Sequence, residues 1–274
     1  MTFSLFAHGT LRFDNGRWYD GSRFVQRTMW SVDGVFRDSF DGAPDSVVDL
    51  AGGWVIPPFG DAHHHAFGGG DPARDILRFL SAGIFYVKNP NNQRSLAAPI
   101  RPKVNLPESV DVIYSNGGLT ATGGHPSPIY GPGLEGDAYF FVDDEASLAR
   151  TWPQVLAGQP DFLKIYLEDS GTPKNRGLDP KLVPSIVKRA HAAGLTVSAH
   201  VTSAADFRIA VAAGVDEINH LPLEKLTSDD ASRAAAKKTR VVTTTISHRD
   251  TSRVKDLDAL HRENLQLLHN HGVG

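Results

Sequence analysis

Histidines dominate the residues of this sequence that could do chemistry. The densest group is the triplet His63-His64-His65, which follows a predicted strand at residues 54–56. Because side chains along an extended chain point alternately to opposite sides, His63 and His65 should point one way and His64 the other. Two imidazoles on one side of a strand end can bind one metal ion, whereas the same triplet in a solvated turn would bind nothing. The pair supports a metal site only if further ligands lie at the ends of later strands.

Two later strand ends each carry one histidine. His200 ends the apolar run 195–199, and His220 ends the run 215–219. Enzymes built on (β/α) barrels place their catalytic groups at the carboxyl ends of strands. Either histidine alone is more often a capping or buried structural residue. Four imidazoles at three strand ends are much harder to explain without a shared function.

The fifth candidate is Lys164, which stands in the middle of the apolar strand 162–166. A lysine is costly to bury while it is charged and unpaired. It could extend its amine to the surface, form a Schiff base with a substrate as in barrel aldolases, or react with CO2 to give a carbamate that bridges two metal ions. The Schiff base needs no histidine cluster, whereas the carbamate explains both the lysine and the histidines.

The chain divides into two regions with different patterns. Residues 1–52 contain short apolar runs broken by the turn dipeptides Asn15-Gly16, Asp20-Gly21 and Asp33-Gly34, which predicts a small β-rich domain. From residue 53 to 274 strands alternate with helices, which predicts a parallel sheet covered by helices. We expect strands at residues 54–56, 84–87, 110–115, 162–166, 196–199, 217–219 and 241–245. We expect helices at residues 72–82, 144–156, 179–193, 204–213, 228–238 and 256–270.

Composition excludes several functional classes. The 274 residues carry a formal net charge of -3, with 22% charged residues, which excludes an acidic disordered chain and a basic nucleic-acid binder. There is no cysteine, so disulfides, zinc–thiolate sites and thiol catalysis are excluded. The sequence shows neither an apolar stretch of about 18 residues nor a signal peptide. We expect a cytoplasmic protein that acts on a small molecule and binds neither nucleic acid nor membrane. The sequence does not fix the oligomeric state, so a homo-oligomer remains open.

Four segments resemble the amidohydrolase superfamily in sequence, order and spacing. They are residues 48–65, Phe162-Leu163-Lys164-Ile165-Tyr166, Ser198-Ala199-His200-Val201 and Ile218-Asn219-His220-Leu221-Pro222. Within the superfamily, the glycine-rich segment 117–125 is similar to the imidazolonepropionase and prolidase-like branch. The resemblance implies an α/β fold with a TIM-like (β/α) barrel behind a small N-terminal β-sandwich-type sheet.

The resemblance also implies a binuclear metal centre. His63 and His65 would hold one divalent metal, His200 and His220 the second, and carboxylated Lys164 would bridge them. Such ligands suit zinc and leave Mn, Fe or Co open. A hydroxide shared by the metals would hydrolyse a C–N bond in an amide, peptide-like or cyclic amide substrate. Because ligands do not fix the bond that is cleaved, an ester, lactone or phosphotriester hydrolase remains an alternative, as does a non-catalytic barrel used for binding.

Three further residues are weaker candidates for substrate contacts. His125 lies in the glycine-rich segment after the third barrel strand, and Asn89 follows the second. Tyr166 lies two residues beyond Lys164 and should point the same way. A turn residue bonded to backbone is the alternative for His125, and asparagine is common in loops. The remaining histidines are expected at the surface: His8, His191, His248, His261, His269 and His271.

The strand count predicts an incomplete barrel. Seven barrel strands are predicted, whereas a closed barrel has eight. The superfamily pattern also needs a catalytic Asp at the end of the eighth strand, which would lie beyond residue 274. Asp250 is the late acidic residue nearest to a strand end, and it lies too far past that end to substitute. We therefore expect the sequence to be truncated, and this chain alone to be poorly soluble and inactive.

Overall fold

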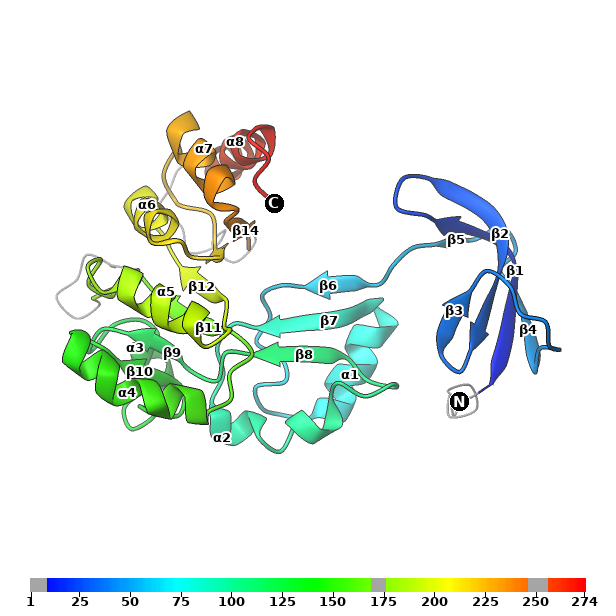
Figure 1. Ribbon diagram of the computed structural model, residues 1–274, viewed down its shortest axis with the longest axis horizontal. Coiled ribbons are helices and arrows are strands. Elements are labelled where there is room, and N and C mark those ends of the chain that lie inside the picture. Colours follow the sequence, from blue (N-terminus) through cyan, green and yellow to red (C-terminus); the bar gives the residue numbers. More distant parts are fainter. Residues whose placement is uncertain (1–8, 169–175, 246–255) are drawn as a thin grey trace.

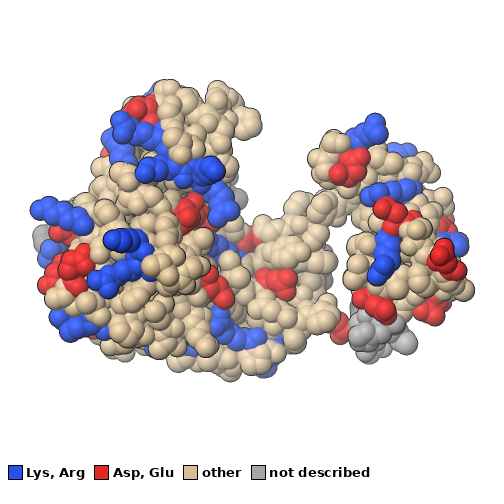
Figure 2. Space-filling model, viewed as in Figure 1, with Lys and Arg blue, Asp and Glu red and all other residues tan. Residues whose placement is uncertain are grey.

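The fold is seen in a computed structural model that describes residues 9–168, 176–245 and 256–274. Two parts follow each other along the chain, an N-terminal sheet and a larger α/β part (Figure 1). On the face drawn in Figure 2, acidic and basic side chains are intermixed over both parts. No helix among the described residues has the length and apolar composition of a membrane-spanning segment.

The N-terminal part is β-rich, as the turn-rich sequence predicts, and its described residues form one sheet of five strands. β1 pairs antiparallel with β2 and parallel with β4 and β5. The Asp33-Gly34 dipeptide forms the turn between β2 and β3, with positive φ at both residues. Asn15-Gly16 does not end a strand; it makes an irregularity within β1. The strands are β1 (Thr10–Tyr19), β2 (Phe24–Val32), β3 (Val35–Arg37), β4 (Ser46–Asp49) and β5 (Trp54–Val55).

The strand predicted at residues 54–56 exists, but it does not lead directly to the histidine triplet. As β5 it pairs with β1 of the N-terminal sheet. The strand that precedes the triplet is β6 (Phe59–Asp61), which pairs with β7 (Ile84–Asn89). Pro57 and Pro58 separate the two strands, because proline lacks the N–H group that a strand ladder needs and restricts the residue before it. The chain therefore changes sheets at these prolines.

The strands of the α/β part are parallel, as predicted, but the described residues form two sheets rather than the single sheet expected. One has the order β6-β7-β8, and the other has the order β10-β9-β11-β12-β13-β14. The further strands are β8 (Asp111–Tyr114), β9 (Gly118–Thr120), β10 (Tyr139–Phe141), β11 (Leu163–Tyr166), β12 (Val197–His200), β13 (Glu217–Asn219) and β14 (Arg240–Val242). Within the described residues β6 and β14 each pair on one side only, so a closed TIM-like barrel is not formed there.

Helices cover the outer side of the six-stranded sheet and one side of the smaller sheet (Figure 1). All six predicted helices are present, with ends within a few residues of those expected. The largest shift is in α5, which begins at Val183 rather than at Asp179. The Asp179 side chain instead accepts a hydrogen bond from the backbone N–H of Lys181. The helices are α1 (Pro72–Ser81), α2 (Arg94–Ala97), α3 (Ser127–Tyr130), α4 (Glu145–Ala157), α5 (Val183–Ala192), α6 (Ala204–Ala213), α7 (Ser228–Lys237) and α8 (Leu257–Asn270).

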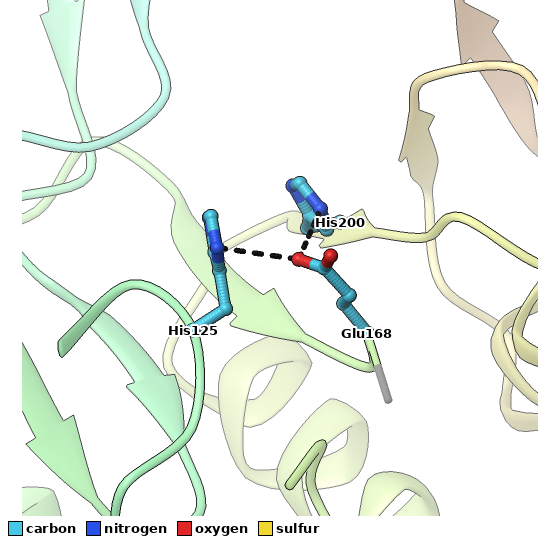
Figure 3. A group of neighbouring side chains, drawn as sticks. All are labelled: His125, Glu168 and His200. Carbon is cyan, nitrogen blue, oxygen red and sulfur yellow. Dashed lines mark ion pairs between the residues drawn. The ribbon is translucent and has the colours of Figure 1, made fainter. Parts of the chain in front are cut away.

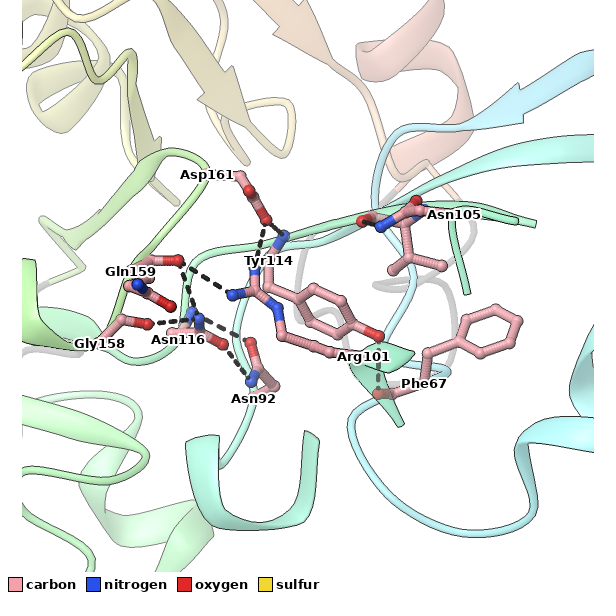
Figure 4. A network of polar contacts seen from close by, with 10 residues as sticks. Phe67, Asn92, Arg101, Asn105, Tyr114, Asn116, Gly158, Gln159 and Asp161 are labelled. Atoms are coloured by element: carbon pink, nitrogen blue, oxygen red, sulfur yellow. Dashed lines mark hydrogen bonds and ion pairs between the residues drawn. The ribbon is translucent and has the colours of Figure 1, made fainter. Parts of the chain in front are cut away.

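The region of the third predicted barrel strand contributes to both sheets. β8 pairs with β7, and after a turn with positive φ at Asn116 and Gly117 the chain continues as β9, which pairs with β11. Asp161 fixes this crossing: its carboxylate accepts the Tyr114 backbone N–H at 2.7 Å, and its own N–H donates to the Tyr114 carbonyl at 2.8 Å (Figure 4). Arg101 pairs with the same carboxylate at 2.7 Å. These contacts join the segment before β11 to the end of β8.

Side-chain alternation gives the six-stranded sheet an apolar face and a polar face. Ile165, Ala199 and Ile218 belong to the large apolar core beneath the helices. Their neighbours along each strand point the other way. These buried inward-facing residues are Lys164, Ser198, Glu217 and Asn219. The polar face leads to the strand ends that carry the histidines.

Candidate metal centre

The histidine triplet after β6 divides as strand alternation predicts. The rings of His63 and His65 lie 5.5 Å apart, and His63 lies 4.8 Å from the ring of His220. His64 points away and packs edge-on against Phe79 of α1, with ring centroids 5.0 Å apart. The first and third histidines therefore face the interior, while the middle one belongs to the helix layer.

A hydrogen bond engages one ring nitrogen of His65 and leaves the other available. Its Nδ1 lies 3.0 Å from the backbone carbonyl of Asn91. Because a carbonyl oxygen can only accept, Nδ1 carries the proton in this bond and Nε2 is left with its lone pair. Metal-binding histidines are commonly oriented in this way.

His200 and His220 are joined by a hydrogen bond between ring nitrogens that are also close enough to be two ligands of one ion. The Nδ1 of His200 lies 3.0 Å from the Nε2 of His220, and the rings are 4.4 Å apart. At a zinc–nitrogen distance of about 2.0 Å, two ligands of a tetrahedral ion are about 3.3 Å apart. His220 has a positive φ of 76°, a conformation that is uncommon outside glycine and often marks a functional position. The bend at the end of β13 turns its ring toward His200.

Lys164 does not extend its amine to the surface, because its side chain is 1% exposed. The amine donates to the Oδ1 of Asn219 and lies 5.4 Å from the centre of the Tyr166 ring. Burial lowers the pKa of Lys164 to about 7, although the charge of Glu217 acts in the opposite direction. A substantial fraction of the amine is therefore neutral near pH 7. The neutral amine is the reactive form in both remaining interpretations, the Schiff base and the carbamate.

A polar network that the sequence analysis missed surrounds Lys164. Lys88 of β7 pairs with Glu217 of β13 at 2.7 Å, and Ser198 donates to Glu217 at 2.9 Å. Ser198 and Asn219 are also joined at 2.9 Å. The signal was present in the alternation of Glu217, Ile218 and Asn219, which places two polar side chains on the inward face. The network connects the lysine to both sheets.

The donor set is suited to a divalent metal. Burial, followed by the charge of Lys164 and of neighbouring imidazoles, strongly lowers the pKa of His63, so the ring is neutral at pH 7. Only a neutral imidazole can act as a ligand. Among the described residues, the buried Nδ1 of His63 has no hydrogen-bond partner. Such a group is rare in native proteins and calls for an explanation, such as an ion.

The three candidate substrate contacts lie in different surroundings. His125 stacks on His200 with ring centroids 4.6 Å apart and lies 5.0 Å from Tyr166. Tyr166 is 3% exposed, and burial raises its pKa well above the usual value, so its hydroxyl keeps its proton. Asn89 donates to the Ala66 carbonyl and accepts from the Asn91 backbone N–H. His125 and Tyr166 thus adjoin the histidines, while both polar ends of Asn89 are engaged with backbone.

Glu168 lies beside the candidate histidines, although the sequence analysis did not name it. Its Oε2 lies 3.2 Å from the Nδ1 of His125 and 3.0 Å from the Nε2 of His200 (Figure 3). The ligand atoms of these three residues lie within 4.8 Å of one another. Its place could have been inferred from sequence. The every-second-residue alternation that puts Lys164 and Tyr166 on one side, continued by one step, puts residue 168 on that side too.

The remaining sequence expectations concern residues away from the histidine cluster. His261 was expected at the surface, but it is 2% exposed on the inner side of α8, which is amphipathic. Asp250, the late acidic residue, lies outside the described residues. His8 and His248 also lie outside them.

Comparison with solved structures shows the fold. An amidohydrolase has a TM-score of 0.73 at 20% identity, covering 96% of this chain and 76% of its own. A prolidase complexed with N-methylphosphonate-L-proline has a TM-score of 0.73 at 19% identity, with the same coverage. A Xaa-Pro dipeptidase with methionine bound in its active site has a TM-score of 0.74 at 17% identity, with coverage of 96% and 77%. No protein-family model and no curated protein matches. The chain therefore has the fold of these amidohydrolase and prolidase structures.

Proposed function

We propose that this chain is a metal-dependent hydrolase that cleaves a C–N bond in an amide, peptide-like or cyclic amide substrate. The observation that carries the proposal is the convergence of four imidazoles, from three strand ends, beside a buried lysine. The fold supports it, because the similar structures include an amidohydrolase, a prolidase and a Xaa-Pro dipeptidase.

Five residues would hold two divalent ions, with zinc favoured by the nitrogen and oxygen donors. His63 and His65 would bind one ion, and His200 and His220 the other. Lys164 would join the two ions as a carbamate: its neutral amine forms an N–C bond with CO2 and releases one proton. The bound ions would activate water and polarise the substrate carbonyl.

The remaining residues would act on the substrate and on the ligands. Tyr166 keeps its phenolic proton, so its hydroxyl can donate a hydrogen bond to a carbonyl oxygen in the site. His125 lies against both Tyr166 and His200, where its ring can contact the same substrate group. Asn219 holds the Lys164 side chain in place through its amide oxygen.

Metal analysis and a substrate panel test this proposal together. Purified protein should bind two equivalents of zinc, and the loaded protein should hydrolyse members of a panel of N-acyl amino acids, dipeptides and cyclic amides. Cleavage of esters, lactones or phosphotriesters alone would replace the C–N assignment with the runner-up chemistry. Failure to bind metal would contradict the hydrolase and favour a binding role. Trapping of a carbonyl substrate on Lys164 by borohydride would favour the Schiff base.

A further inference from the structure

The geometry points to Glu168 as a positioning residue: its carboxylate orients His200 toward the metal and ties His125 to the same centre. This inference rests on the proposed function. It assigns a role to a residue just beyond the end of β11, outside the five proposed ligands.

The first step concerns the two nitrogens of His200. Nδ1 faces His220 at 3.0 Å, and Nε2 faces the Glu168 carboxylate at 3.0 Å on the opposite side of the ring. The two atoms are close without hydrogen-bond geometry, so the carboxylate acts on the ring through its negative charge, which favours the tautomer with the proton on the nearer nitrogen, Nε2. Nδ1 then keeps the lone pair that a metal requires. A carboxylate behind a histidine ligand also fixes the ring orientation and raises its basicity.

The second step concerns His125. The same Oε2 atom lies 3.2 Å from its Nδ1, and its ring stacks on that of His200 with 26° between the planes. The three side chains are largely shielded, at 10% to 21% exposed, so their contacts are weakly screened by solvent. One carboxylate therefore sets the spacing between a proposed metal ligand and a proposed substrate contact.

The competing interpretation is that the three residues hold an ion of their own. Their ligand atoms are close enough for that. The two interpretations differ on His125, because the ring is a direct ligand in the second and not in the first. The two interpretations also differ on the Glu168→Gln variant. Its amide oxygen can still face Nε2 of His200, but an amide is a poorer metal ligand than a carboxylate.

The experiment measures metal binding in four variants of the full chain. The variants are Glu168→Gln, Glu168→Ala, His125→Ala and, as a control, Glu145→Gln, which changes an exposed carboxylate paired with Arg189 on the helix layer. Zinc affinity is measured by competition with a chromophoric chelator, stoichiometry by elemental analysis, and ligand geometry by the visible spectrum of the cobalt-substituted protein. Thermal unfolding of each metal-free variant reports whether the fold is retained.

We expect Glu168→Ala to weaken zinc binding at one site by roughly 10- to 100-fold and to alter the cobalt spectrum. Glu168→Gln should lose less affinity than Glu168→Ala, because the amide oxygen still orients His200. His125→Ala and Glu145→Gln should keep the wild-type stoichiometry. Loss of one ion in His125→Ala would overturn the positioning role in favour of direct ligation. Wild-type affinity and spectrum in Glu168→Ala would overturn it outright, while a wild type without metal would instead contradict the proposed function.

Discussion

A buried amine such as that of Lys164 is costly to keep charged, and its lowered pKa shows that burial outweighs the nearby acidic charge. Lys164→Ala should therefore reduce bound zinc to well under two equivalents, because the bridge between the two ions is lost. A short carboxylic acid such as propionate should restore part of the metal by filling the vacated space. Lys188→Ala, which changes an exposed lysine on α5, is the matched control. Full metal content in Lys164→Ala would refute the carbamate.

The histidine triplet gives a prediction in which neighbouring residues have opposite effects. His63→Ala and His65→Ala should each remove a ligand and lower zinc content. His64→Ala should keep the metal but reduce the free energy of unfolding by about 1 kcal/mol, since it loses the edge-on contact with Phe79. Metal analysis and urea unfolding of the three variants measure both effects. Metal loss in His64→Ala with full metal in His65→Ala would show that the strand register is shifted by one residue.

At the scale of elements, β9 must approach β11 closely for the site to form. A Cβ atom at Gly118 would lie 2.5 Å from the Tyr166 ring and 3.2 Å from the Lys164 side chain. Gly118→Ala should therefore displace both residues, lower stability by about 1 to 3 kcal/mol and weaken zinc binding. In Gly69→Ala the new methyl would have its nearest neighbour at 3.6 Å, so this control should bind zinc normally. Thermal unfolding and chelator competition give the two readouts, and normal zinc binding by Gly118→Ala would contradict the prediction.

The elements themselves were largely predictable from sequence, because long amphipathic helices and strands of alternating polarity leave a local pattern. The strands β9 and β10 were missed, although β13, which is equally short, was predicted. β9 lies in the glycine-rich segment 117–125, whose composition is typical of a loop. The pairing of Trp54 with β1 was also missed. Pairing partners depend on tertiary contacts that a local pattern does not contain.

The site was predictable to the extent that alternation along strands places side chains on one face. This reasoning put His63 and His65 together, away from His64, as the structure has them. It was not extended to Glu168. The Lys88–Glu217 pair could not be found in this way, because its partners come from strands 129 residues apart.

For the whole molecule, the ion pair between Lys88 and Glu217 joins the two sheets across the interior. Both side chains are largely buried, at 14% and 10% exposed, and Lys88 also lies 4.1 Å above the Phe162 ring. Glu217→Ala leaves a buried cation without its partner and should cost about 3 kcal/mol of unfolding free energy. The double change Lys88→Met with Glu217→Leu should recover most of that loss. Urea unfolding of both variants tests this, and equal stability of Glu217→Ala and wild type would refute it.

The same pair predicts a pH dependence of stability. Burial alone would raise the pKa of Glu217. The charge of Lys88 and the surrounding hydrogen bonds outweigh this effect and lower the pKa below its ordinary value of 4.5. A carboxyl group with a lowered pKa in the folded state stabilises the fold above its ordinary pKa, and this contribution disappears as the pH falls through the lowered value. The Lys88→Met, Glu217→Leu double variant should lose less stability than wild type between neutral pH and about pH 3. Identical losses in urea unfolding would contradict this.

The distance along the chain between Lys88 and Glu217 has a consequence for folding kinetics. Most strands of the six-stranded sheet pair with near neighbours in sequence, whereas this ion pair closes a segment of 129 residues. Closing a long segment costs chain entropy, so we expect this contact to form late, after the folding barrier has been crossed. Its loss in Glu217→Ala should then accelerate unfolding and leave the refolding rate nearly unchanged. On this prediction, the interior charge pair would govern the lifetime of the native state rather than the speed with which it is reached, and stopped-flow unfolding and refolding of Glu217→Ala would measure both rates.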